Sequence, residues 1–164
     1  MTDRYLELAN TNLTKSLFDG LGLPTPVRLK REDNADPHQL TGNVLLGSSQ
    51  GEGFSGEITS ILSSTPLAMV NAGDDNKVSL VFDASGISSA DESIQLYEFF
   101  NQNLKLLAQC GRVIVLGHRP ESLSNTTHAT LQRGLVGFVK SVAKEIGRKG
   151  ATANLIYVDK GGKA

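Results

Sequence analysis

Five short apolar runs recur along the chain, and the later ones are separated by stretches with helical spacing. The runs are Val44–Leu46, Leu67–Val70, Val78–Phe82, Val113–Leu116 and Ala153–Val158. A half-exposed strand alternates apolar and polar positions, whereas a strand buried on both faces is apolar throughout. The pattern therefore predicts five buried strands of a parallel sheet.

Two segments between the strands have the period of a helix. The first opens with the capping-box pattern Ser89-Ala90-Asp91-Glu92. Its apolar residues at helical spacing are Ile94, Tyr97, Phe100, Leu104 and Leu107. The second runs from about Thr127 to Arg148, with one apolar face formed by Leu131, Leu135, Phe138, Val142 and Ile146. Strands that alternate with helices predict an α/β fold: a doubly wound, about five-stranded parallel sheet flanked by helices, flavodoxin-like or a truncated Rossmann fold.

The first 39 residues have a different character. They contain two short helical candidates, Arg4 to Ala9 and Leu13 to Leu21, followed by two closely spaced prolines and a polar run. Prolines at this spacing stop a helix, and the polar run is typical of a loop. We interpret residues 1–39 as an N-terminal helical arm, residues 40–158 as the α/β domain and residues 159–164 as the beginning of a linker.

Composition and charge limit the class of protein. The 164 residues are 39% hydrophobic, with 16 basic and 17 acidic side chains and a net charge of -1. This is enough for one domain with a core, and it gives no electrostatic support for binding nucleic acid or a membrane. The single cysteine, Cys110, excludes an internal disulfide and is interpreted as an ordinary buried thiol. With no leader or apolar span of about 18 residues, we expect a soluble, cytoplasmic protein.

A glycine-rich loop, GSSQGEG, follows the first strand. Gly47, Gly51 and Gly53 are spaced to let a pyrophosphate approach a helix N-terminus. Alternatively, the hydroxyls of Ser48 and Ser49 would wrap a single phosphate, as in a flavodoxin. Glu52 opposes both interpretations, because a carboxylate in an anion-binding loop repels the anion. We therefore predict a simple strand-to-helix turn with no bound cofactor.

Three other polar residues follow strands or open a helix. Asp83 ends the third strand, where a receiver domain has its phospho-acceptor, but the acidic pair for Mg²⁺ is missing, so a turn or capping role is predicted. His118 follows the fourth strand and His128 opens the long helix. No cysteine or histidine lies at metal-ligand spacing from them, and no metal site is predicted.

Four segments of the second half resemble the short-chain dehydrogenases in the right order. LVFDASGI resembles the family's VNNAGI turn, GRVIVLGH its GRIVNIGS strand, GLVGFVKSVAKE its GVIGFTKSLAKE helix, and RKGATANLI its RKGITVNAI strand. In that family a serine, a tyrosine and a lysine carry catalysis. Their positions correspond here to His118, His128 and Gln132, so the resemblance implies that the proton donor and its cationic partner are missing.

The whole chain resembles something narrower. The arm's YLELAN and LGLPTPV, the strand NVLLG and the C-terminal IYVDKGG are similar to the N-terminal, flavodoxin-like domain of high-molecular-weight 3-oxoacyl-acyl-carrier-protein reductases. The resemblance implies a non-catalytic structural or assembly domain of fatty-acid metabolism. The parent's following ketoreductase domain would be its partner and would bind NADH or NADPH. The alternatives are a module that binds flavin mononucleotide or a nucleotide, and a stand-alone reductase.

The long helix also has a stripe of small residues, Gly134, Gly137 and Ser141, between its apolar and charged sides. Glycines inside an exposed helix cost about 1 kcal/mol each relative to alanine. A stripe without side chains lets another helix approach closely. We therefore predict an interface here, either in a homodimer or with the reductase domain.

Overall fold

The computed structural model describes residues 7, 11–22, 27, 29, 41–50, 53–72, 74 and 77–159. Its centre is a five-stranded, all-parallel sheet in the order β2-β1-β3-β4-β5. The strands are β1 (Gly42–Ser48), β2 (Leu67–Met69), β3 (Lys77–Asp83), β4 (Leu107–Gly117) and β5 (Thr152–Tyr157). All five predicted strands are present, and the predicted burial is confirmed for β1, β3 and β4. It is wrong for β2 and β5, which contain no fully buried residue because they are the edge strands of the sheet.

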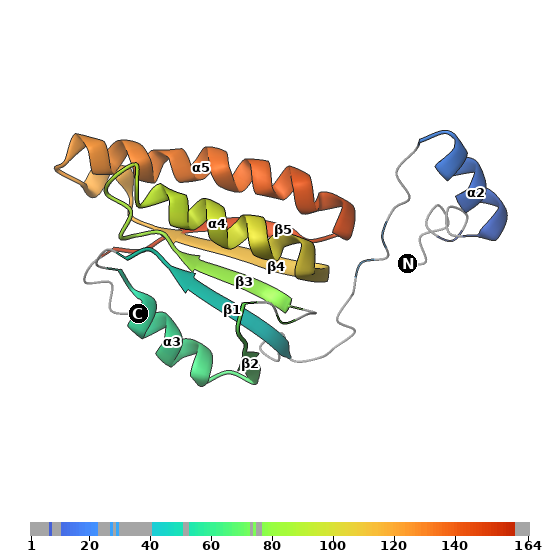
Figure 1. The fold of residues 1–164 in the computed structure, drawn as a ribbon, viewed down its shortest axis with the longest axis horizontal. Helices are drawn as coiled ribbons and strands as arrows, with labels where there is room; N and C mark the ends of the chain where they lie inside the picture. Colours follow the sequence, from blue (N-terminus) through green and yellow to red (C-terminus); the bar gives the residue numbers. More distant parts are fainter. Residues whose placement is uncertain are drawn as a thin grey trace.

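Helices cover both faces of the sheet, which makes the fold doubly wound as predicted. Helices α4 (Ser93–Asn103) and α5 (Thr126–Ile146) lie on one face and α3 (Ser55–Ser63) lies on the other (Figure 1). Three single 3₁₀ turns cover Leu104–Leu106, Pro120–Ser122 and Gly147–Lys149. No helix in the described part of the chain is long and apolar enough to span a membrane.

The arm contains one described helix, α2 (Asn12–Gly20), which corresponds to the second helical candidate. Of the first candidate the structure describes only Glu7, which is helical. In Figure 1 α2 lies beyond the ends of the strands and covers no face of the sheet.

The main core lies between the sheet and helices α4 and α5. Val113 and Val115 of β4 and Leu80 of β3 are completely buried there. Phe82, Phe99, Phe100 and Phe138 form a connected aromatic group, with ring centroids 5.0 to 6.1 Å apart. Complete burial of a phenylalanine, as at Phe82 and Phe100, stabilises the fold by roughly 1.5–3 kcal/mol, whereas Phe99 and Phe138 are half-buried. A smaller cluster of Val44, Ile58 and Val81 joins α3 to the opposite face.

Two local predictions are wrong. Leu107 was expected at the end of the first long helix, but α4 ends at Asn103 and Leu107 begins β4, opposite Lys77. Cys110 is half-buried rather than fully buried, and its φ of 57° lies in the left-handed region. The register between β3 and β4 shifts between Lys77 and Ser79. This irregular start of β4 explains why the apolar pattern detects the strand only from Val113 onward.

Predicted helix starts agree with the observed contacts. The Glu92 carboxylate accepts hydrogen bonds from the Ser88 and Ser89 N–H groups at 2.6 and 3.0 Å, while Glu92 N–H donates to Ser89 Oγ at 3.4 Å. This is the reciprocal arrangement of a capping box, one turn before α4. Asn125 caps α5, because its Oδ1 accepts the N–H of His128 at 2.9 Å.

Candidate functional site

The candidate site lies at the carboxyl edge of the sheet. The strand order reverses between β1 and β3, and open α/β sheets bind ligands beyond the strand ends at such a point. Ser48 and Asp83 end these two strands side by side. His118 follows β4 next to them, so the topology brings the glycine loop and the histidines to one edge.

Asp83 occupies the reversal point with its own side chain, which is 1% exposed. Its Oδ2 accepts the Phe54 N–H at 2.5 Å, and Phe54 is the N-cap residue of α3. Its Oδ1 accepts the N–H and the Oγ–H of Ser85 at 3.1 and 2.5 Å. A helix N-terminus attracts an anion through its unpaired N–H groups and its dipole. Here a carboxylate of the protein itself takes that place, which agrees with the predicted turn or capping role of Asp83.

The two described glycines of the loop are explained by close packing. A Cβ at Gly47 would lie 2.4 Å from the Phe99 ring, and a Cβ at Gly53 would lie 2.5 Å from Asp83 Oδ2. Ser49 is buried and its N–H donates to the Asp83 carbonyl at 3.0 Å, whereas Ser48 is exposed. Gly51 and Glu52 lie outside the described residues. Gly47 and Gly53 are therefore required by neighbouring side chains whether or not a phosphate binds.

Gln132 connects the ends of β3 and β4 from inside α5. Its side chain is completely buried, and Oε1 accepts the N–H of His118 at 2.8 Å. Nε2 donates to the carbonyls of Ala84 at 2.8 Å and Ile87 at 3.0 Å. Both ends of the amide are therefore used by backbone groups, which satisfies polar groups that would be costly to bury unpaired.

The two histidines lie together above this amide. Their rings are 5.9 Å apart, and the His118 ring also contacts Phe54 at 5.4 Å. His118 Nδ1 is 3.0 Å from the Val158 carbonyl oxygen and His128 Nε2 is 3.3 Å from that of Ser85. A carbonyl oxygen only accepts, so in both contacts the ring nitrogen donates. In a neutral imidazole, His118 Nε2 and His128 Nδ1 are then hydrogen-bond acceptors.

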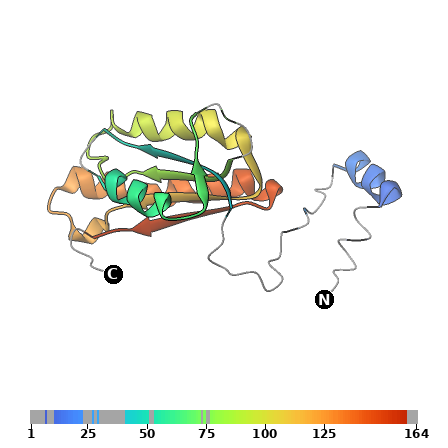
Figure 2. The same cartoon turned by 90° about the horizontal axis from the view of Figure 1, so that it is seen from below.

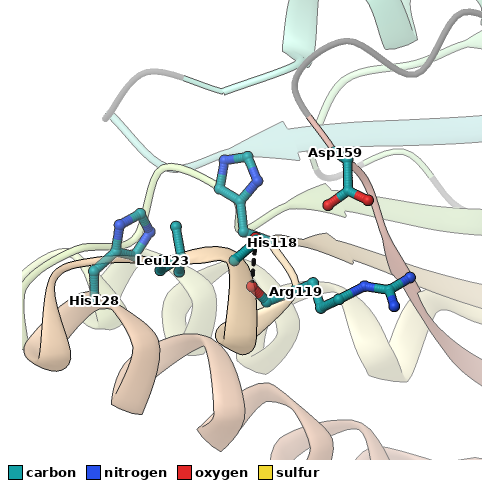
Figure 3. Close-up of a pocket in the computed structure, with 6 residues that line it drawn as sticks. His118, Arg119, Leu123, His128 and Asp159 are labelled. Atoms are coloured by element: carbon teal, nitrogen blue, oxygen red, sulfur yellow. Dashed lines mark hydrogen bonds between the residues drawn. The ribbon is translucent and has the colours of Figure 1, made fainter.

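An open cavity of about 650 Å³ adjoins the histidines. It is lined by His118, Arg119, Ser122, Leu123, His128 and Asp159. Figure 3 shows His118 between His128 and Asp159, with Arg119 beside them. No group of three histidine, cysteine, aspartate or glutamate side chains in the described ranges is arranged to hold a metal ion.

The structure brings together the three positions that the sequence resemblance aligns with the catalytic residues of the short-chain dehydrogenases. His118, His128 and Gln132 share one hydrogen-bonded corner. Sequence reasoning missed two features of this corner: the contact from Asp83 to Phe54 and the bridging role of Gln132. The second left a signal, because a polar residue falls within the apolar arc of α5, three residues before Leu135, and a buried polar residue must find partners.

The predicted interface stripe lies on the surface of α5. Gly134, Gly137 and Ser141 are exposed, and a Cβ added at either glycine meets nothing within 4 Å. Unlike Gly47 and Gly53, these two glycines are not required by any described neighbour within the chain.

Comparisons with known proteins support the fold. No protein-family model and no curated protein matches the sequence. Among solved structures, the chain is similar to a double variant of a Serratia marcescens short-chain dehydrogenase/reductase, at 17% identity and a TM-score of 0.57 over 73% of this chain and 80% of that one. It is also similar to a short-chain dehydrogenase family protein from Francisella tularensis, at 10% identity and a TM-score of 0.52 over 74% and 70%. At these identities the likeness shows a Rossmann-like α/β fold.

Proposed function

We propose that this chain is a non-catalytic structural and assembly domain of a cytoplasmic, nicotinamide-dependent 3-oxoacyl-acyl-carrier-protein or acyl-CoA reductase of fatty-acid metabolism. The four family-like segments and the arm support the parentage, and the Rossmann-like fold agrees with it. In this proposal a separate ketoreductase domain of the same protein binds NADH or NADPH and carries out the reduction.

The burial and hydrogen bonds of Gln132 are the main support for the proposal. A short-chain reductase needs a lysine at this position to hold the nicotinamide ribose and lower the pKa of its tyrosine. Gln132 is neutral, completely buried and bonded at both ends to the backbone. It therefore has no charge to offer His128 and no polar atom left for a ribose hydroxyl.

The strand-end loop argues in the same direction. A dinucleotide would place its pyrophosphate near the N-terminus of α3, where the Asp83 carboxylate already accepts the Phe54 N–H. A phosphate there would have to displace this carboxylate or approach a like charge in a buried site. The residues present therefore do not fit a nicotinamide dinucleotide, and the same contacts disfavour flavin mononucleotide at this loop.

Activity measurements on the purified chain test the proposal. With acetoacetyl-CoA and either NADH or NADPH, we expect no oxidation of the nicotinamide above the rate without enzyme. A complete short-chain ketoreductase assayed in parallel is the positive control. Turnover that disappears in a His128→Ala variant would show that His128 is catalytic and would refute the proposal.

Calorimetry with flavin mononucleotide and NADH tests the competing ligand-binding function. We expect no binding in the micromolar range to the wild-type chain. If binding occurs and is lost when Arg119→Ala alters the cavity, the domain is a ligand-binding module. If a coding sequence that continues past Ala164 contains a Y-x-x-x-K ketoreductase domain, the parentage is correct.

A further inference from the structure

The two faces of the sheet are covered to different extents at β4 and β5. On the α4 and α5 face, Val113 and Val115 are completely buried. On the opposite face, Ile114 and Leu116 are only half-buried and Ile156 is 45% exposed. Leu116 and Ile156 are register partners, so they share that face. We call Ile114, Leu116 and Ile156 the open face.

Helix α3 does not extend over the open face. It packs over β1 and β2, near the opposite edge of the sheet from β5. Figure 2 shows α3 in front of the sheet, with no other labelled or coloured helix in front of β5. Ile156 of the edge strand and the exposed parts of Ile114 and Leu116 are therefore left uncovered by the described elements, although Ile114 and Leu116 also pack against the cluster of Val44, Ile58 and Val81 and the exposed Asn154 lies beside Ile114.

Helix α2 of the arm has exposed apolar residues on one side. Leu17 and Leu21 are 62% and 64% exposed, and residues four apart lie on the same side of a helix. The helix continues to Leu21, whose N–H donates to the Leu17 carbonyl at 3.0 Å. A helix of nine residues is too short to be stable alone in water and needs a surface to pack on.

The arm contacts the domain near the amino end of β5. Leu29 and Val27 contact Gly150, where an added Cβ would lie 2.8 Å from Leu29 Cδ2 and 3.6 Å from Val27 Cγ1. Gly150 comes just before β5 begins at Thr152. The chain from Gly20 to Val27 spans at most about 25 Å when extended. Thr152 and Ile156 lie four positions apart in β5, a distance of only about 13 Å along the strand.

We propose that α2, which lies beyond the strand ends in Figure 1, folds back in solution onto the open face of its own chain, with Leu17 and Leu21 against Ile114 and Ile156. The short tether gives α2 an effective concentration in the millimolar range at this face, well above the concentration of a second copy in a dilute solution. Lys15 points to the other side of the helix and stays in water. The arm thereby supplies the helix that the β4 and β5 side of this face lacks.

Thiol labelling of the full 164-residue chain tests the proposal. Cys110→Ala removes the natural thiol and Ile156→Cys places a reporter on the open face. Leu17→Asp with Leu21→Asp should accelerate maleimide labelling of the Ile156→Cys thiol by about tenfold, the change expected when a helix docked in roughly nine of ten molecules is released. Ile61→Cys, on the exposed side of α3, is the matched control and should label at the same rate with or without the aspartates. Lys15→Asp should leave both rates unchanged.

Chain concentration distinguishes the occupants. Protection by the chain's own α2 is independent of concentration between dilute and concentrated samples, whereas protection by a second copy increases with it. Concentration-dependent protection, or equal labelling rates with and without the two aspartates, would overturn the proposal. Ile114→Cys repeats the test should Ile156→Cys perturb the edge strand.

Discussion

The side-chain amide of Gln132 accepts the backbone N–H of His118 at 2.8 Å, across the gap between α5 and the end of β4. The same amide donates to the end of β3 through Ala84. Gln132, the position that the sequence resemblance aligns with a catalytic lysine, thus connects the ends of β3 and β4. Its role is structural because every polar atom of its side chain bonds the backbone.

The first prediction is that Gln132→Ala strongly destabilises the chain. The change leaves the buried His118 N–H and the Ile87 carbonyl without the partners that Gln132 supplies, and each unsatisfied group costs about 1–3 kcal/mol. We expect urea unfolding to report a loss of roughly 2–5 kcal/mol in the free energy of unfolding. Arg133→Ala, on the next residue, removes only an exposed ion pair with Glu121 and should cost less than about 1 kcal/mol. Equal effects of the two variants would contradict the bridging role.

The second prediction concerns the close approach of Gly53 to Asp83. A Cβ at Gly53 would lie 2.5 Å from the buried carboxylate, so Gly53→Ala should destabilise the fold by about 1–3 kcal/mol. Gly56, in the first turn of α3, has open space around its Cα, and Gly56→Ala should stabilise by roughly 0.5–1 kcal/mol. These opposite signs should be visible in the midpoints of urea unfolding.

A double-mutant cycle identifies the carboxylate as the cause. Asp83→Ala alone should destabilise the chain, because the Phe54 and Ser85 N–H groups lose their acceptor. In that background Gly53→Ala should cost much less, since the nearest atom it would meet, Asp83 Oδ2, is gone and only the milder contact with Ser85 Oγ at 3.1 Å remains. Additive effects of the two changes would mean that the cost of Gly53→Ala comes from something other than the Asp83 side chain.

Much of the fold can be predicted from the sequence because it depends on local patterns. Each strand contains an apolar run. The capping box before α4 and the apolar faces of the long helices are visible within stretches of about ten to twenty residues. The pattern fails at Leu107, where an apolar residue at helical spacing continues the apparent helix although the chain has already entered β4. The contact from Asp83 to Phe54 joins residues 29 positions apart and has no local signature. Only topology brings the carboxylate to the start of α3.

The candidate site follows the same division. Resemblance to the reductases identifies His118, His128 and Gln132 as one group, and the structure brings them together. What each residue does there depends on hydrogen bonds to distant carbonyls. The sequence cannot show those bonds, although a glutamine inside the apolar arc of α5 is a sign that such partners exist.

The third prediction is a pH-dependent contribution of Glu92. Hydrogen bonds from the Ser88 N–H, the Ser88 hydroxyl and the Ser89 N–H hold the pKa of this carboxyl below its usual value. A pKa that is lower in the folded state gives stability that is present above the unfolded-state pKa and is lost as the pH falls through the folded-state pKa.

Comparison with Glu92→Gln measures this contribution. The wild-type chain should be more stable than the variant near neutral pH, and the difference should shrink as the solution is acidified below about pH 4.3. Glu98→Gln, on the exposed side of the same helix, controls for the loss of one negative charge. If the difference in the free energy of unfolding between the wild type and Glu92→Gln stays constant from neutral to acidic pH, the ionised carboxylate has no role.

The last prediction, which rests on the proposed function, is that the stripe of Gly134, Gly137 and Ser141 on α5 is an assembly interface of the proposed parent protein. An added Cβ at Gly137 meets nothing within 4 Å, so Gly137→Leu fits the folded domain and should raise helix stability by about 0.5–1 kcal/mol. The same leucine would fill the groove through which another helix approaches. Sedimentation of the full-length protein should therefore show weaker association for Gly137→Leu. Gly56→Leu, an equally open helical position on the opposite face of the sheet, should associate as the wild type does. If both variants assemble like the wild type, the two glycines have no role in assembly and the proposed interface is wrong.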